Sequence, residues 1–125
     1  MNTSKIVLLF FLCALNSCKD QKSIAPIDVS ELTIAGIHKA YQESTYTSSE
    51  LVQAYQKRIE GLDNTINSIT TLNPKAITNA KALDEEFVKT GILRPLHGIP
   101  IIIKDNINTT GIRTTAGSLA LQDYT

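Results

Sequence analysis

A single lysine follows an uninterrupted apolar run in the last quarter of the chain. Residues 99–103 read Ile-Pro-Ile-Ile-Ile and lead directly into Lys104, Asp105 and Asn106. Desolvation disfavours the ammonium form of lysine and lowers its pKa, so a lysine held at the edge of a core can act as a general base. Asp105 and Asn106 add an acceptor and an amide that can orient this neighbourhood. Taken alone, the same pattern also fits a solvated lysine at the end of a strand.

Three helices are predicted ahead of this lysine. Apolar spacing predicts the first over about residues 34–43. The second opens with a capping box made by Thr47 and Glu50, and the third opens with Asn73-Pro74 and stops at Gly91. Apolar stripes support the last two helices: Leu51, Tyr55, Ile59 and Leu62, then Ala76, Ala80, Leu83 and Phe87.

Extended structure is predicted around the lysine. The β-branched run 99–103 is typical of a strand covered on both faces, with Pro100 near its start because proline lacks an N–H donor. Residues 64–72 suit a short strand or an extended link. Asn108–Gly111 predicts a turn into a second short extended piece, Ile112–Thr115.

The N-terminus has the order of an export signal. A positive charge at Lys5 precedes the apolar run Ile6–Leu15, which is shorter than the roughly 20 residues that span a bilayer. Leu15-Asn16-Ser17-Cys18 resembles a bacterial lipobox, whose cleavage leaves a lipid-modified cysteine; an ordinary secretory signal is the alternative. We therefore expect a signal peptide over 1–17, a flexible tether over 18–29 and a domain over 30–125. The expected location is exported, as a periplasmic or outer-membrane lipoprotein held to the membrane through its lipid anchor.

Charge and cysteine content narrow the choice of partners. The chain has 12 basic and 12 acidic residues, and removal of 1–17 takes away only Lys5. A near-neutral chain without a basic block argues against nucleic acid as a partner. Cys13 would be lost with the signal, so Cys18 has no partner for an internal disulfide. No cluster has metal-ligand spacing and no glycine-rich loop resembles a phosphate cradle, so we expect neither a metal nor another cofactor.

The lysine segment resembles the amidase signature family. In that family the pattern P-L-H-G-I-P, three apolar residues and K-D-N, followed by T-T-A-G-S, carries the catalytic lysine, and here it runs from Pro95 to Asn106 and from Thr114 to Ser118. Thr47–Leu62 resembles the family's T-x-x-E-L-V-x-A-Y-x-x-R-I-E helix. Asn67–Ala76 resembles its segment ending in N-P-x-A. The resemblance thus covers nearly all of the chain after the tether.

The resemblance implies a Ser–cis-Ser–Lys triad with Lys104 as general base. The family's bridging serine, nucleophilic serine and glycine- and serine-rich oxyanion loop lie downstream of T-T-A-G-S, so only the lysine of the triad matches a position here. The implied fold is α/β: a mixed, twisted sheet covered by helices on both faces. Residues 30–125 would supply its N-terminal helices and first core strands, as an incomplete part of the domain.

Three further residues are candidates to support the lysine. Asp105, Asn106 and Ser118 are expected to surround Lys104 or to line the substrate pocket, with plain turn formation as the alternative for Ser118. His97 has no acid partner and a glycine beside it, so we expect it to shape the turn before the strand. His38 lies on a helix face, in the core or at the surface.

The function implied is that of an exported amidase. It would hydrolyse carboxamide bonds in a small-molecule or peptide substrate through the serine nucleophile of the complete protein. One alternative is a truncated, non-catalytic lipoprotein, expected to be poorly soluble or molten because three modest helices cover only one face of an apolar strand. The other is a protein like an amidotransferase A subunit, delivering ammonia to a charged tRNA. The export signal argues against that second alternative.

Overall fold

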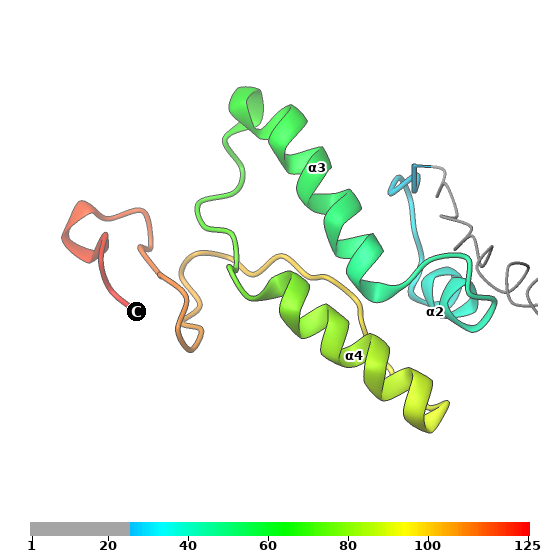
Figure 1. Cartoon of the computed structure of the whole chain (residues 1–125). Helices are drawn as coiled ribbons and strands as arrows, with labels where there is room; N and C mark the ends of the chain where they lie inside the picture. Colours follow the sequence, from blue (N-terminus) through cyan, green and yellow to red (C-terminus); the bar gives the residue numbers. More distant parts are fainter. Residues whose placement is uncertain (1–25) are drawn as a thin grey trace, which may run out of the picture.

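The computed structural model describes residues 26–125 (Figure 1). The predicted signal peptide, Cys18 and most of the predicted tether lie outside the described residues. The helices are α2 (Ile34–Gln42), α3 (Ser48–Ile66), α4 (Ala76–Thr90) and the short 3-10 helix η2 (Leu119–Leu121). Helices α3 and α4 pack against each other, and α2 lies near the start of α3. After α4 the chain turns back along that helix and then leaves it (Figure 1).

The helix boundaries follow the local signals with one shift. The predicted capping box is present: Thr47 Oγ1 accepts the Glu50 N–H, and the Glu50 carboxylate accepts the Thr47 N–H at 2.7 Å. Gly91 ends α4 at a φ of +67°. Helix α4 begins at Ala76, later than predicted, because the Asn73 side chain accepts the Lys75 N–H in a preceding turn.

A carboxylate from α4 adds to the cap of α3. Asp84 Oδ1 accepts the Ser48 N–H at 2.7 Å, and Asp84 Oδ2 accepts the Ser49 N–H at 3.0 Å. Both amides belong to the first turn of α3, where backbone donors have no partner inside the helix and a negative charge is favoured. Asp84 therefore ties α4 to α3 at the end where α2 also packs.

Substitution Asp84→Asn is expected to loosen this tie. The amide keeps one acceptor and loses the charge, so we expect a loss of about 1 kcal/mol in the free energy of unfolding, measured by chemical denaturation. Glu85→Gln is the matched control, since Glu85 is exposed on the same helix. Equal denaturation midpoints for the two variants would contradict the role given to Asp84.

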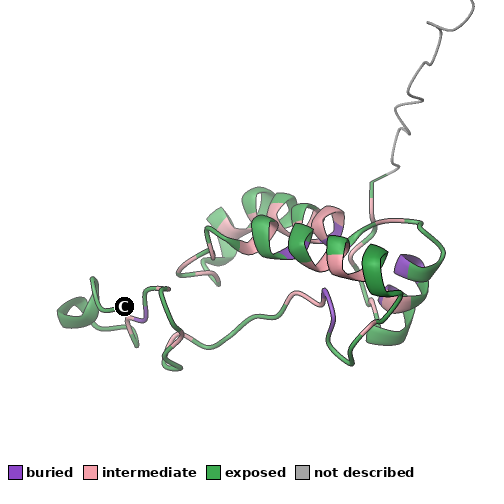
Figure 2. Ribbon diagram, turned by 60° about the horizontal axis from the view of Figure 1, so that its bottom comes forward, coloured by how far each residue is buried: buried purple, intermediate pink, exposed green. Residues whose placement is uncertain are grey.

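The buried core lies where α2 meets α3. Ile37, Tyr41 and Leu51 form its centre, and Leu51 is fully buried. Figure 2 shows buried positions on the helices and in the turn that follows α4, whereas the chain beyond that turn is largely exposed. Ile27 and Val29, at the end of the predicted tether, also pack against this centre. The packed part of the chain thus includes residues upstream of Ser30.

The predicted strands do not form within the described part of the chain. Residues 26–125 contain no β-sheet; the only β-pairing among them is an isolated antiparallel bridge between Thr109 and Ile112. Segment 99–103 is irregular because a strand needs a neighbouring extended segment to pair with, and none of the described segments pairs with it. Ile101 and Ile102, predicted to be buried, are 67% and 82% exposed.

The other predicted extended segments also differ in detail. Helix α3 continues to Ile66, so the segment predicted over 64–72 is reduced to an irregular link, in keeping with the link rather than the strand alternative. The predicted turn is present, with the Ile112 N–H donating to the Thr109 carbonyl at 3.3 Å. Residues 112–115 form no strand beyond the bridge at Ile112. None of the helices within residues 26–125 combines the length and apolar character needed to cross a membrane.

Candidate active site

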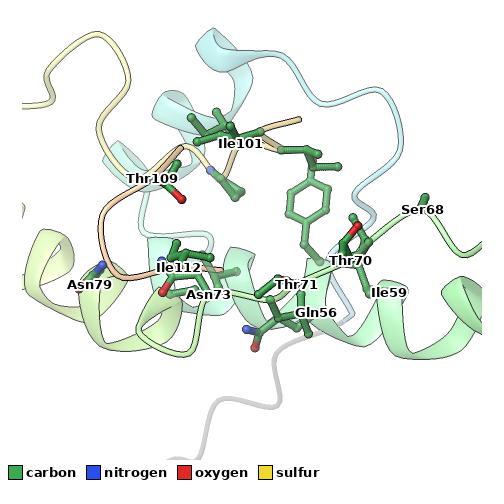
Figure 3. Close-up of a pocket in the computed structure, with 18 of the residues that line it drawn as sticks. Gln56, Ile59, Ser68, Thr70, Thr71, Asn73, Asn79, Ile101, Thr109 and Ile112 are labelled. Atoms are coloured by element: carbon green, nitrogen blue, oxygen red, sulfur yellow. The ribbon is translucent and has the colours of Figure 1, made fainter. Parts of the chain in front are cut away.

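Lys104 lines a broad groove between the helices and the returning chain. The groove has a volume of about 1320 Å³, and its walls come from α3, α4, the link after α3 and the segment that leads to Lys104. In Figure 3, Gln56 and Ile59 of α3, Asn79 of α4 and Ile101 surround this space. The groove places an apolar wall beside the candidate base.

The side chain of Lys104 is exposed. The sequence predicted that a strand buried on both faces would desolvate it. In the described residues Ile101 and Ile102 are themselves exposed, so no strand buried on both faces leads into Lys104. The position of Lys104 is instead defined by its backbone, which is held at two places.

The first of these places is Gly98, at the start of the lysine segment. The Tyr41 hydroxyl donates to the Gly98 carbonyl at 2.8 Å, and the Ser48 hydroxyl donates to the same oxygen at 3.3 Å. Burial raises the pKa of Tyr41 to about 12, so its hydroxyl remains protonated and able to donate at neutral pH. One side chain from α2 and one from α3 therefore donate to the same backbone oxygen, six residues before Lys104.

His97 has a structural place in the same turn. Its ring is buried, and its Nε2 donates to the Leu83 carbonyl of α4 at 3.0 Å. The His97 carbonyl accepts from Nε2 of His38 at 3.1 Å, and Nδ1 of His97 has no hydrogen-bond partner among the described residues. The prediction that His97 shapes the turn is confirmed, and His38 is half-buried beside it.

The second anchor is Asp105, directly after Lys104. Its Oδ1 accepts the Thr115 N–H at 2.9 Å, its Oδ2 accepts the Thr115 hydroxyl, and its carbonyl accepts the Ala116 N–H at 3.0 Å. The hydrogen bonds from the Thr115 hydroxyl and amide hold the pKa of Asp105 below its usual range. The carboxylate is thus ionised at neutral pH and accepts from both groups.

Of the remaining predicted site residues, Ser118 is connected to this anchor through Thr115, whereas Asn106 is not. Ser118 belongs to the turn that Thr115 starts: its N–H donates to the Thr115 carbonyl at 2.8 Å, and its hydroxyl accepts the Ala120 N–H at 3.3 Å. Asn106 is exposed and takes part in none of these contacts. The structure therefore brings Asp105 and the T-T-A-G-S turn together beside Lys104, while Ser118 caps η2.

Sequence reasoning missed several residues that hold the site. Apolar spacing predicts the helix that carries Tyr41, but it gives no sign that the Tyr41 hydroxyl donates to the Gly98 carbonyl. Asp84 has no local sign of capping a helix that begins 36 residues earlier. Thr115 lies inside a recognised motif, yet its pairing with Asp105 required a turn whose geometry the sequence did not reveal. Within the described chain no group of three His, Cys, Asp or Glu side chains is placed to hold a metal ion.

The sequence profile of the amidase family matches residues 50–125. This match covers α3 from Glu50 onward, α4, the Lys104 segment and the T-T-A-G-S turn. The chain belongs to the amidase family. It is 44% identical over 98 residues, or 78% of its length, to the A subunit of the glutamyl-tRNA(Gln) amidotransferase of Dehalococcoides mccartyi. It is 33% identical over 113 residues to the "Probable amidase" of Arabidopsis thaliana, over 88% of this chain.

The backbone also resembles that of a solved amidase. The crystal structure of native peptide amidase from Stenotrophomonas maltophilia superimposes with a TM-score of 0.72 over 75% of this chain, at 39% identity. This similarity supports an amidase fold for this chain. The chain spans about a fifth of the length of these relatives: 20% of the amidotransferase subunit, 22% of the Arabidopsis amidase and 20% of the peptide amidase.

Proposed function

We propose that this chain is the N-terminal part of an amidase that hydrolyses carboxamide bonds in small-molecule or peptide substrates. The observation that carries the proposal is the complete lysine motif, from Pro95 to Asn106, in a chain that belongs to the amidase family. The peptide amidase that superimposes on this chain supports amides as the substrate class. Lys104 is the general base of this proposal.

The proposed reaction adds water across the carboxamide C–N bond and yields a carboxylic acid and an amine. Neutral Lys104 takes a proton from a bridging serine, which in turn deprotonates the nucleophilic serine. The nucleophile attacks the carbonyl, the amine leaves with a proton, and water releases the acid from the acyl-enzyme. Both serines belong to the family pattern downstream of T-T-A-G-S. Backbone N–H groups there would stabilise the oxyanion.

The exposed isoleucines fit the same proposal. Ile101, Ile102 and Ile103 present apolar area that soluble proteins rarely leave in contact with water. We propose that in the whole protein residues 99–103 form a strand of the mixed sheet, covered on both faces. Lys104 would then stand at the end of a desolvated strand, in the environment that its sequence predicts.

The gene that encodes this chain provides the first test. Sequence that continues in frame after the codon for Thr125 should contain a glycine- and serine-rich segment within about 100 residues, a typical domain length. The whole gene product should then release ammonia from primary amides. An early stop codon would contradict the enzyme proposal and favour the non-catalytic lipoprotein.

The similarity to an amidotransferase subunit favours a second candidate function. The relative from Dehalococcoides mccartyi is 44% identical and is named as acting with glutamyl-tRNA(Gln). A protein of that kind would work in the cytosol, so its precursor should remain unprocessed there and need tRNA for its reaction. Amide hydrolysis without tRNA by an exported protein would exclude this candidate.

We also propose that the protein is exported and lipid-anchored at Cys18. The support is the order of charge, apolar run and cysteine in residues 1–18. A diacylglycerol group plus an N-acyl chain would hold the protein stably at a membrane, whereas one acyl chain binds only marginally.

Replacement of Cys18 by alanine is expected to block this processing. The precursor should accumulate, lose incorporation of labelled palmitate and no longer respond to globomycin. Cys13→Ala is the matched control, since Cys13 lies within the apolar run and would be removed with the proposed signal. Normal processing and membrane association of the Cys18→Ala protein would contradict the lipid anchor.

A further inference from the structure

The backbone that leaves Lys104 is held by one local hydrogen bond from Ile107 and by contacts from Thr115 and Ala116, about ten positions further along the chain. The Lys104 carbonyl accepts the Ile107 N–H at 2.9 Å, and the Asp105 carbonyl accepts the Ala116 N–H at 3.0 Å. The Asp105 carboxylate receives both the amide and the hydroxyl of Thr115. These bonds hold the peptide units on both sides of Asp105, and thereby the direction in which the Lys104 side chain leaves the backbone.

Thr115 is the centre of this arrangement. Its hydroxyl donates to Asp105 Oδ2 and accepts the Gly117 N–H at 3.2 Å. Its carbonyl accepts the Ser118 N–H at 2.8 Å. One side chain therefore joins the residue after the candidate base to the turn that carries Ser118. We call the contacts between Asp105 and Thr115 the Asp105–Thr115 clamp.

The clamp is accompanied by an unfavourable backbone conformation. Ala116 has a φ of +49°, where a side chain costs roughly 1–2 kcal/mol, and Gly117 follows at +72°. Two successive left-handed residues turn the chain sharply and bring Thr115 against Asp105. Conformations of this kind gather at sites where the surrounding structure holds the chain for a function.

We propose that Thr115 is a positioning residue for amide hydrolysis, which holds Asp105 and through it sets the orientation of Lys104. The inference rests on the proposed function for its reaction, whereas the clamp itself is a feature of the described residues. Thr115 touches neither the scissile bond nor the reacting proton in this proposal. Its contribution is to remove alternative orientations of the base, and misplacement of a catalytic group by about 1 Å can cost on the order of 100-fold in rate.

Substitutions at Thr115 in the whole gene product separate positioning from folding. Thr115→Val keeps the shape and removes the hydroxyl, so kcat should fall by about 10- to 100-fold with KM unchanged. Thr115→Ser restores the hydroxyl and should recover most of kcat. Thr110→Val is the matched control, because Thr110 is exposed in the neighbouring turn, and it should leave both constants as they are.

A second measurement tests the clamp without any assay of activity. Hydrogen exchange of the Ala116 amide, which donates to the Asp105 carbonyl, should be faster in Thr115→Val than in the wild type or in Thr110→Val. If the wild-type protein hydrolyses no amide, the proposed function fails and exchange alone decides whether the clamp exists. Unchanged exchange in Thr115→Val would overturn the clamp.

The kinetic outcomes also decide the positioning role. Wild-type kcat in Thr115→Val, or equal losses in Thr115→Val and Thr115→Ser, would overturn it. Should Thr115→Val fail to fold, Asp105→Asn supplies the second variant, since it keeps the shape and removes the charge. Asp105→Asn is expected to lower kcat by about 10- to 100-fold while KM holds, and wild-type kcat in that variant would overturn the proposal.

Discussion

Alanine at position 104 is expected to lower kcat/KM for amide hydrolysis by about 10²- to 10⁴-fold in the whole gene product, the range typical of losing a general base. The expected cause is that the proton of the bridging serine then has no acceptor at the right distance. Export should stay unchanged, because position 104 lies far from the signal predicted over residues 1–17. The thermal midpoint and the circular dichroism spectrum show whether the variant is folded. Steady-state kinetics with a primary amide measure the effect.

Two further variants separate basicity from charge. Lys104→Arg keeps the positive charge but cannot lose its proton near neutral pH, so it should be as impaired as the alanine variant. Lys81→Ala is the matched control, since Lys81 is exposed on α4. Activity of Lys104→Ala within about tenfold of wild type would remove this lysine from the mechanism.

The second large effect is expected from Gly98→Ala, and it concerns stability. A Cβ at Gly98 would lie 2.7 Å from Ser48 Oγ and 2.9 Å from Ser48 Cβ, well inside contact distance, and 3.0 Å from the Tyr41 ring. The residue also has a φ of +69°. We expect about 1–2 kcal/mol from the left-handed backbone and about 1–3 kcal/mol more from overpacking. The thermal midpoint of the protein should fall accordingly.

Gly91→Ala provides the control for the backbone contribution. Gly91 has nearly the same φ, +67°, but a Cβ there would meet nothing within 4 Å. Its substitution should show the backbone cost alone, and Ser48→Gly combined with Gly98→Ala should recover part of the difference. Equal losses for Gly91→Ala and Gly98→Ala would show that the Tyr41–Ser48–Gly98 contact is not tightly packed.

The helices were predictable because their signals are local. The capping box of Thr47 and Glu50 and the stop at Gly91 each act within one turn, and the structure confirms both. The start of α4 was predicted too early. An asparagine side chain can cap a helix, or it can accept the amide two residues ahead in a turn that precedes the helix, and Asn73 makes the second kind of bond with Lys75. Local propensity alone does not decide between these two bonds.

The strand predicted over residues 99–103 does not form among the described residues, and the reason is different. A run of β-branched apolar residues indicates burial, but strand structure also needs a hydrogen-bonded neighbour, and the described residues do not provide one. The prediction therefore identified an apolar segment correctly and assigned it a pairing that residues 26–125 lack.

The candidate site was predictable in part. Motif spacing selected Lys104, Asp105 and Ser118, and the structure places Asp105 in contact with the turn that contains Ser118. The contacts that hold the site were not predictable, because they join residues far apart in sequence. Tyr41 and Gly98 are 57 positions apart, and their hydrogen bond depends on how α2 packs against the turn after α4.

The most direct test of the central claim is the partition of the acyl group between water and hydroxylamine. The whole gene product is incubated with hydroxylamine and either the primary amide or the anilide of the same acid. Hydrolysis through a shared acyl-enzyme predicts release of ammonia or aniline and the same hydroxamate-to-acid ratio from both substrates. No release of amine above the enzyme-free blank, or ratios that differ with the leaving group, would contradict the account.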